Sequence, residues 1–195
     1  QRRASSATIS ADITLDQARV RCRDVRGVEG LYAAYAARGL GYGPAFRAVQ
    51  GLWTADGEVV AELALPETAA GEAVSAFGVH PVLLDACLQS AGAALGETGE
   101  VYLPVRAARW SVSGIAAAGV RVWCHARTRV SAEGAVIDLT VFAPDGRVVG
   151  RLEELALQRA TPDALRRAVQ RGDEWTYELA WRPVPLRSAA LQPAL

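Results

Sequence analysis

A carboxylate and an amide four residues apart are the side chains of this sequence best placed to do chemistry. Asp85 and Gln89 lie in the apolar segment HPVLLDACLQSAG, residues 80–92. Helical spacing places them on one stripe with Gly92, beside a stripe of leucine, alanine and cysteine. Desolvation there raises the pKa of a carboxyl, so we expect Asp85 to stay protonated near neutral pH. Oriented by Gln89, it could act as a general acid, although a buried pair with only a structural role fits the spacing at least as well.

The bulk composition narrows the class of protein. The 195 residues carry a formal net charge of zero with 22% charged residues, which gives no electrostatic reason to expect a nucleic acid or an anionic membrane as partner. No apolar run approaches the ~20 residues of a membrane-spanning helix, and no signal-peptide pattern is present. All 21 basic residues are arginines, so a Schiff-base or P-loop lysine is excluded.

The sulfur-containing residues indicate the compartment and the extent of the chain. Cys22, Cys87 and Cys124 have no metal-ligand or CxxC spacing and lie in apolar settings, which is typical of reduced thiols in a cytosolic protein. We therefore expect a cytoplasmic location and no metal site. The chain contains no methionine, so we expect it to be a piece of something longer.

The segments before Asp85 predict a helix, a turn and a hairpin. Residues 1–26 are polar and arginine-rich without a sustained period, which predicts a linker. Helical spacing over 28–39 predicts a helix closed by a glycine, and GYGPAF at 41–46 predicts a tight turn. Residues 48–65 alternate on both sides of Asp56–Gly57, the residue pair typical of a two-residue hairpin turn.

The region from Asp85 onward predicts one long helix and several antiparallel strands. The helix is expected at 81–95, and the strands at 101–113, 119–130, 135–143 and 147–159. One helix buried against a curled antiparallel sheet is an α+β architecture of the hotdog type. Further along, 162–171 predicts a short surface helix, and 173–186 begins a new strand-like pattern.

The strand VRVWCHARTRV separates its side chains into two faces. Small apolar residues and a threonine occupy one face, while Trp123 and His125 share the other with Arg121, Arg127 and Arg129. We expect the first face to pack and the second to be solvated or interfacial, with His125 having no chemical role. An alternative is that these arginines help to dock an acidic partner.

Three motifs carry a resemblance to a known family. GYGPAF (41–46), HPVLLDACLQ (80–89) and YLP (102–104), in this order, resemble the dehydratase domains of modular polyketide synthases. The segment 31–53 resembles the one that opens the second half of those domains, and 177–185 resembles the linker before the ketoreductase region. After Leu103 and Pro104 this sequence has VRAARW. The family more often has phenylalanine directly after Leu-Pro, with a tryptophan close behind.

The resemblance implies that the chain is one half of a double hotdog. In that family the first hotdog carries a catalytic histidine in an HxxxGxxxxP motif, and the second carries an aspartate in DxxxQ or DxxxH. Asp85 and Gln89 match the second motif, and no HxxxGxxxxP pattern occurs. The implied domains are an inter-hotdog linker at 1–26, the C-terminal hotdog at 27–160, and a linker leading into the ketoreductase region at 161–195.

The implied activity is dehydration of a β-hydroxyacyl thioester during polyketide chain extension, which yields the α,β-unsaturated thioester. The missing histidine would take the α-proton and Asp85 would protonate the leaving hydroxyl. Gln89 would hold Asp85, and Tyr42 could present its phenol to either group. The thioester acidifies the α-proton, so no metal or redox cofactor is expected, and the substrate rides on the phosphopantetheine arm of an acyl carrier protein. The expected substrate contacts are Gly43, Pro44, Phe46, Leu103 and Pro104.

The resemblance also implies partners and leaves alternatives open. The expected partners are an N-terminal hotdog with the catalytic histidine, the acyl carrier protein, neighbouring synthase domains and a second copy in a homodimeric synthase; neither nucleic acid nor membrane is expected. Without the first hotdog the chain would be an incomplete enzyme. The alternatives are an inactive structural remnant, which the intact Asp85 and Gln89 disfavour, and a double-bond isomerase or cyclase. His80 is expected to be structural, because His-Pro opens the helix in this family.

Overall fold

The computed structural model describes residues 13–69, 79–96, 101–113, 121–132 and 134–161. The chain divides into two compact units, 1–162 and 163–195, and every described residue belongs to the first. The helix expected at 162–171 and the strand pattern expected at 173–186 lie outside the described residues. Together with the domain boundaries expected at 26/27 and 160/161, they stay predictions.

One antiparallel sheet dominates the described residues. Its strand order is β1-β2-β3-β6-β7-β8-β4, and β5 also pairs with β8. The strands are β1 (Asp24–Arg26), β2 (Val49–Ala55), β3 (Glu58–Ala64), β4 (Val101–Arg106), β5 (Arg109–Val112), β6 (Arg121–Val130), β7 (Gly134–Phe142) and β8 (Val148–Ala160). The strands expected on both sides of the central helix are therefore confirmed, and the segment 101–113 forms two strands where one was expected.

Glycines with positive φ make the tight turns of this sheet. Gly57 has φ +65° in the turn between β2 and β3, as the Asp56–Gly57 pair predicted. Gly146 has φ +82° in the turn between β7 and β8. A side chain at either position would strain the backbone, so these residues favour the register that places alternate strand residues in the core.

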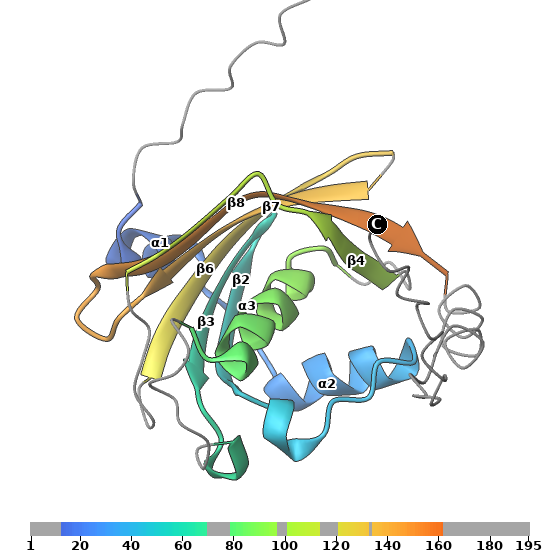
Figure 1. Ribbon diagram of the computed structural model, residues 1–195, viewed down its shortest axis with the longest axis horizontal. Coiled ribbons are helices and arrows are strands. Elements are labelled where there is room, and N and C mark those ends of the chain that lie inside the picture. The colour runs from blue at the N-terminus through green and yellow to red at the C-terminus, as the bar shows by residue number, and fades with distance from the viewer. Residues whose placement is uncertain (1–12, 70–78, 97–100, 114–120, 133, 162–195) are drawn as a thin grey trace, which may run out of the picture. The chain divides into compact units, whose positions relative to one another are not determined.

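Helix α3 (Pro81–Ala93) lies against the concave face of the sheet, which curls around it (Figure 1). Pro81 occupies the first helical turn, where its missing N–H has no intrahelical acceptor to lose. Val82, Leu83, Ala86, Cys87 and Ala91 are buried against the apolar concave face of the strands. This arrangement is the α+β hotdog fold that the sequence predicted.

The short helix α2 (Val28–Ala37) and the 3-10 helix η1 (Pro44–Phe46) flank α3. Gly39 has φ +87°, and its N–H donates to the Ala36 carbonyl, which confirms it as the residue that closes α2. A second 3-10 helix, η2 (Glu67–Ala69), follows β3.

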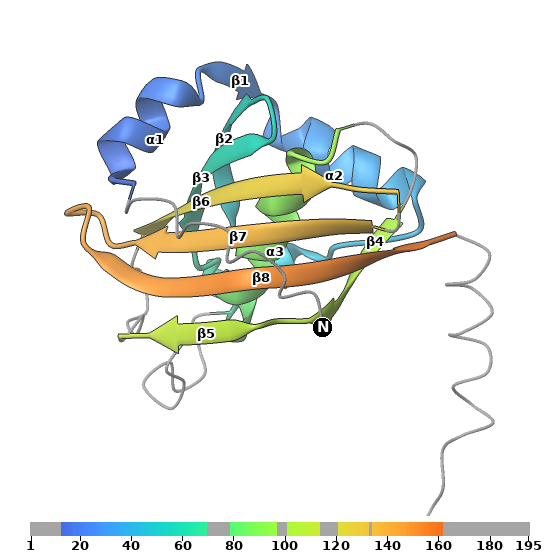
Figure 2. The same cartoon turned by 90° about the horizontal axis from the view of Figure 1, so that it is seen from above.

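The opposite, convex face of the sheet corrects two expectations. Helix α1 (Leu15–Arg21) forms inside the segment expected to be a linker and begins with a Thr14 capping box. Its Leu15 and Ala18 pack against Val60 and Phe142, away from α3 (Figure 2). His125, expected on a solvated or interfacial face, is therefore only 2% exposed. Two apolar turns of α1 are too short to produce a clear period in an otherwise polar segment.

Candidate functional site

Asp85 and Gln89 form a direct hydrogen bond on the stripe of α3 that faces the cavity described below. The Gln89 Nε2 donates to Asp85 Oδ2 at 2.6 Å. Gln89 is 2% exposed, whereas Asp85 is half-buried. The helical spacing of four residues thus places the amide under the carboxyl, as the sequence predicted, with the carboxyl on the more open side.

Two further hydrogen bonds hold Gln89 in place. Its Nε2 also donates to the Phe46 carbonyl at 3.0 Å, so both amide hydrogens are engaged. The Tyr35 hydroxyl donates to the Gln89 backbone carbonyl at 2.6 Å. Gln89 Oε1 is buried and has no partner within the described part of the chain. The turn at 43–46 therefore fixes the orientation of Gln89, which in turn fixes the rotamer of Asp85.

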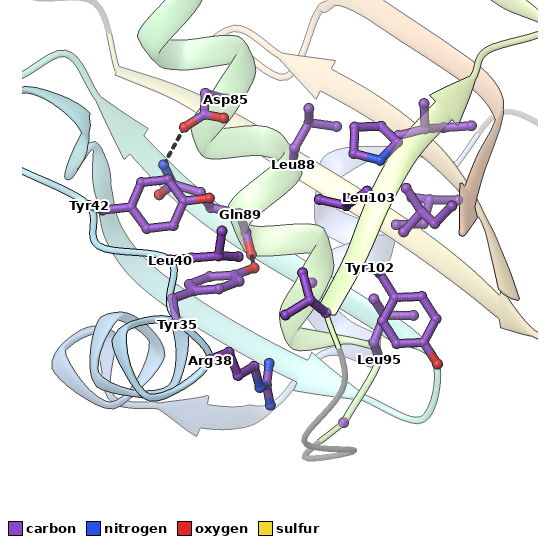
Figure 3. A pocket seen from close by; sticks show the side chains of 17 residues that line it. Tyr35, Arg38, Leu40, Tyr42, Asp85, Leu88, Gln89, Leu95, Tyr102 and Leu103 are labelled. Carbon is purple, nitrogen blue, oxygen red and sulfur yellow. Dashed lines mark hydrogen bonds between the residues drawn. The ribbon is translucent and has the colours of Figure 1, made fainter. Parts of the chain in front are cut away.

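The pair faces a cavity of about 260 Å³ between α3, the α2–η1 connection and β4 (Figure 3). Leu40, Leu88, Leu95 and Leu103 give it largely apolar walls. In Figure 3, Tyr35 and Tyr42 lie on one side of the cavity, and Leu88, Leu103 and Tyr102 lie on the other. The room and the apolar walls suit an acyl chain better than a polar ligand.

Three tyrosines pack together beside the carboxyl. The Tyr42 ring lies 5.3 Å from the ring of Tyr35 and 6.2 Å from that of Tyr32, both edge-on. Burial and the nearby Asp85 charge raise the pKa of Tyr42 to about 12. Its phenol therefore keeps its proton at physiological pH and is available as a hydrogen-bond donor in the cavity.

His80 serves the backbone of its own helix. It is 6% exposed, and its Nδ1 accepts a hydrogen bond from the Val82 N–H at 3.2 Å. It caps α3 in the way that serine or aspartate usually does, and it is not among the residues that line the cavity. This geometry agrees with the structural role expected for His80.

The expected substrate contacts separate into two groups. Leu103 and Pro104 line the cavity. Gly43, Pro44 and Phe46 belong to the turn and η1, are exposed, and do not line the cavity; Phe46 contributes its backbone carbonyl to Gln89. A direct contact of these three residues with substrate stays a prediction, and their evident contribution is to hold Gln89.

Among the cavity residues with a polar or charged side chain, three were not predicted from the sequence, namely Tyr35, Arg38 and Tyr102. Tyr35 and Arg38 come from α2 and its C-cap, and nothing in the spacing of that helix indicates which face meets α3. Only their position just before the GYGPAF turn could have drawn attention to them. Within the described residues, no group of three or more His, Cys, Asp or Glu side chains is placed to hold a metal ion.

Comparison with known proteins gives the family. The model described as the polyketide synthase dehydratase N-terminal domain matches residues 10–167, which is most of the chain. The chain belongs to the polyketide synthase dehydratase family. Mycoketide-CoA synthase of Mycobacterium tuberculosis is 37% identical to this dehydratase-family chain over 168 residues, which cover 83% of this chain and 4% of that synthase.

Solved dehydratase domains share the fold. Structures of two inactive mutants of the CurK dehydratase, from curacin polyketide synthase, have been solved. One has an aspartate replaced by asparagine, and the other has a histidine replaced by phenylalanine. Both are 30% identical to this chain, with TM-scores of 0.70 and 0.69. Each match covers 80% of this chain and 55% of the CurK chain, so this chain spans little more than half of a solved dehydratase domain. The match to mycoketide-CoA synthase shows that this chain resembles a small part of a large synthase. Among the described residues of this chain, no helix is long and apolar enough to cross a membrane.

Proposed function

We propose that this chain supplies the acid half of a polyketide synthase dehydratase. The reaction is loss of water from a β-hydroxyacyl thioester, carried on the phosphopantetheine arm of an acyl carrier protein. The single observation that carries the proposal is the hydrogen-bonded pair of Asp85 and Gln89, which faces a cavity with largely apolar walls.

The proposed step uses one base and one acid. A histidine of the other hotdog removes the α-proton, and the electrons of that C–H bond form the Cα=Cβ double bond. The Cβ–O bond breaks as Asp85 delivers its proton to the leaving hydroxyl, which departs as water. Gln89 holds the carboxyl, and the phenol of Tyr42 donates a hydrogen bond to the hydroxyl. The thioester makes the α-proton acidic enough for this step without a metal or redox cofactor.

The assignment to the C-terminal hotdog rests on the sequence motifs. The matching family model is described as an N-terminal domain, whereas this chain has Asp85 and Gln89 in a DxxxQ pattern and has no HxxxGxxxxP pattern. The CurK mutants lend support, because replacing either an aspartate or a histidine is described as inactivating that domain. The proposed partners are a histidine-bearing hotdog, the carrier protein and neighbouring domains of a homodimeric synthase.

The test is a pair of aspartate substitutions in the double hotdog that contains this chain. Asp85→Asn keeps the size and hydrogen bonding of the side chain but removes the transferable proton, so we expect turnover of a β-hydroxyacyl thioester to fall ~10²–10⁴-fold. Asp145→Asn is the matched control, because Asp145 lies exposed in the β7–β8 turn and pairs with Arg147. Its turnover should equal that of the parent.

Thermal unfolding of both variants completes the test. Asp85→Asn should melt close to the parent, since a neutral carboxyl and an amide cost similar free energy to desolvate. Gln89→Ala should lower the rate less than Asp85→Asn, because it removes only the positioning partner. Parent-like turnover by Asp85→Asn would make the carboxyl structural. If the protein left the β-hydroxyacyl thioester intact but shifted the double bond of a supplied α,β-unsaturated thioester, or closed it into a ring by addition of a hydroxyl of the same chain, the activity would instead be that of an isomerase or cyclase.

A further inference from the structure

Arg38 lines the same cavity at the end opposite Asp85 (Figure 3). Its side chain is half-buried, and it makes no hydrogen bond or ion pair within the described part of the chain. Several other arginines of the described residues pair with a carboxylate, as Arg127 does with Glu58 and Arg129 with Asp138. A partly desolvated guanidinium that lacks such a partner can still bind an acceptor that arrives with a ligand.

The position of Arg38 at the end of α2 does not by itself explain its place in the cavity. Arg38 is the C-cap of α2, and its backbone N–H bonds to the carbonyls of Tyr35 and Ala36. A cation near a helix C-terminus is favourable, but that interaction is equally available to a side chain extended into water. The backbone therefore caps the helix, and the side chain is left for another role.

The cavity between the two ends is suited to hydrocarbon. Leu40, Leu88 and Leu95 line it, and about 10 Å separates Asp85 from Gly92 along α3, at 1.5 Å per residue. The amide groups of a carrier arm laid along these walls would lose their water without gaining partners, which is unfavourable. The methylene groups of an acyl chain have no hydrogen-bonding groups to desolvate, so such a chain can lie along these walls as far as Arg38.

We propose that Arg38 binds a carbonyl or hydroxyl oxygen on the remote part of the acyl chain whose β-carbon lies at Asp85. This inference rests on the proposed function, and it defines the substrate class as long β-hydroxyacyl thioesters that carry an oxygen function well beyond the β-carbon. Arg38 is then a specificity-determining residue that distinguishes an oxygenated chain from a plain alkyl chain. A charge-assisted hydrogen bond at a half-buried site favours the oxygenated chain by about tenfold.

The experiment compares binding of matched ligands to the double hotdog that contains this chain. The probes are N-acetylcysteamine thioesters that lack the β-hydroxyl: one straight saturated chain, and a series in which a ketone replaces one methylene at successive positions. Calorimetric titration should give the parent a maximum preference of about tenfold for one remote ketone position. Arg38→Met should lose that preference and bind the saturated chain as the parent does. Arg109→Met, which removes an exposed arginine paired with Glu153 away from the cavity, should keep it.

The outcomes separate this inference from the proposed function. A parent without preference for any remote ketone, an Arg38→Met variant that keeps the preference, or equal weakening of all ligands would overturn it. Arg38→Gln provides the same test if Arg38→Met melts well below the parent. Turnover of the matching β-hydroxyacyl thioesters by the double hotdog is measured separately. If the parent double hotdog shows the ketone preference but does not turn over these thioesters, the result contradicts the proposed function and leaves the role of Arg38 in binding intact.

Discussion

Two hydrogen-bonded carboxyl groups lie on opposite sides of the sheet and have different surroundings: Asp85 belongs to α3 on the concave side, and Glu58 belongs to β3 and points to the convex side. Asp85 accepts one hydrogen bond, from Gln89, and is open to a cavity with largely apolar walls. Glu58 accepts from His125 at 3.1 Å and pairs with Arg21 and Arg127, both at 3.2 Å. A carboxylate surrounded by three partners has little capacity left for a ligand, whereas one held by a single amide does.

The titration of the convex pair agrees with a structural role. Burial alone would raise the pKa of Glu58, but its hydrogen bond to His125 and the neighbouring arginines lower it. Burial lowers the pKa of His125 and outweighs the opposing effect of Glu58, whose charge is shared with Arg21 and Arg127. His125 is therefore a neutral hydrogen-bond donor that ties β6 to β3 beneath α1. Burial and a charged partner therefore do not by themselves make a catalytic site; access to a cavity is also needed.

Of the substitutions proposed for this protein, removal of the Glu58 carboxylate should cause the largest loss of protein stability. Glu58→Ala leaves a buried histidine without its partner and two arginines without a counter-ion, so the free energy of unfolding should fall by about 2–4 kcal/mol. Turnover per folded molecule should not change, which is the reverse of the Asp85→Asn result. Chemical denaturation and turnover at a temperature where both proteins are folded provide the two measurements. A rate loss on the folded variant would show that the convex face takes part in the chemistry.

The contact between α2 and α3 provides a sharper test of the concave face. A Cβ at Gly92 would collide with the Tyr35 hydroxyl that donates to the Gln89 carbonyl. Gly92→Ala should therefore destabilise the protein by about 1–3 kcal/mol and disturb the support of Gln89.

The matched control is Gly30→Ala on the same α2–α3 region. A Cβ at Gly30 has nothing within 4 Å, so helix propensity should stabilise the protein by about 0.5–1 kcal/mol. Thermal unfolding of the two variants gives the comparison. If Gly92→Ala were as stable as Gly30→Ala, then the Tyr35 hydrogen bond would not hold α3 in place.

The smallest effect is expected in the pH dependence of stability. Since the pKa of His125 is below its usual value of 6.5 in the folded protein, unfolding at lower pH takes up a proton. The stability that neutral His125 contributes is fully present above about pH 6.5 and is lost as the pH falls. His125→Gln, which keeps a donor for Glu58, should lose less stability than the parent between pH 7 and pH 5. Parallel unfolding curves for both proteins over that range would contradict a depressed pKa.

Much of the fold was predictable because its signals are local. Asp56–Gly57 makes the hairpin turn, His-Pro opens α3, and alternation along β6 and β7 matches the observed strands. Helix α1 was not predictable, because Leu15 and Ala18 are too few to form a period and gain their meaning only from Phe142 and the sheet. The same reason explains why the face of β6 that carries His125 was expected to be either solvated or interfacial: alternation gives the face of a strand but not what covers that face.

The sequence by itself determined which residues of α3 could do chemistry. Helical periodicity places Asp85 and Gln89 one turn apart, and this spacing is independent of the rest of the molecule. Tertiary structure alone decided what surrounds them. The Phe46 carbonyl accepts a hydrogen bond from the Gln89 side chain, and the Tyr35 hydroxyl donates one to the Gln89 backbone carbonyl. Arg38 lines the far end of the cavity. These contacts join residues about 40 to 55 positions apart in the chain. No local pattern encodes them, because they depend on how α2 and the turn at 43–46 pack against α3.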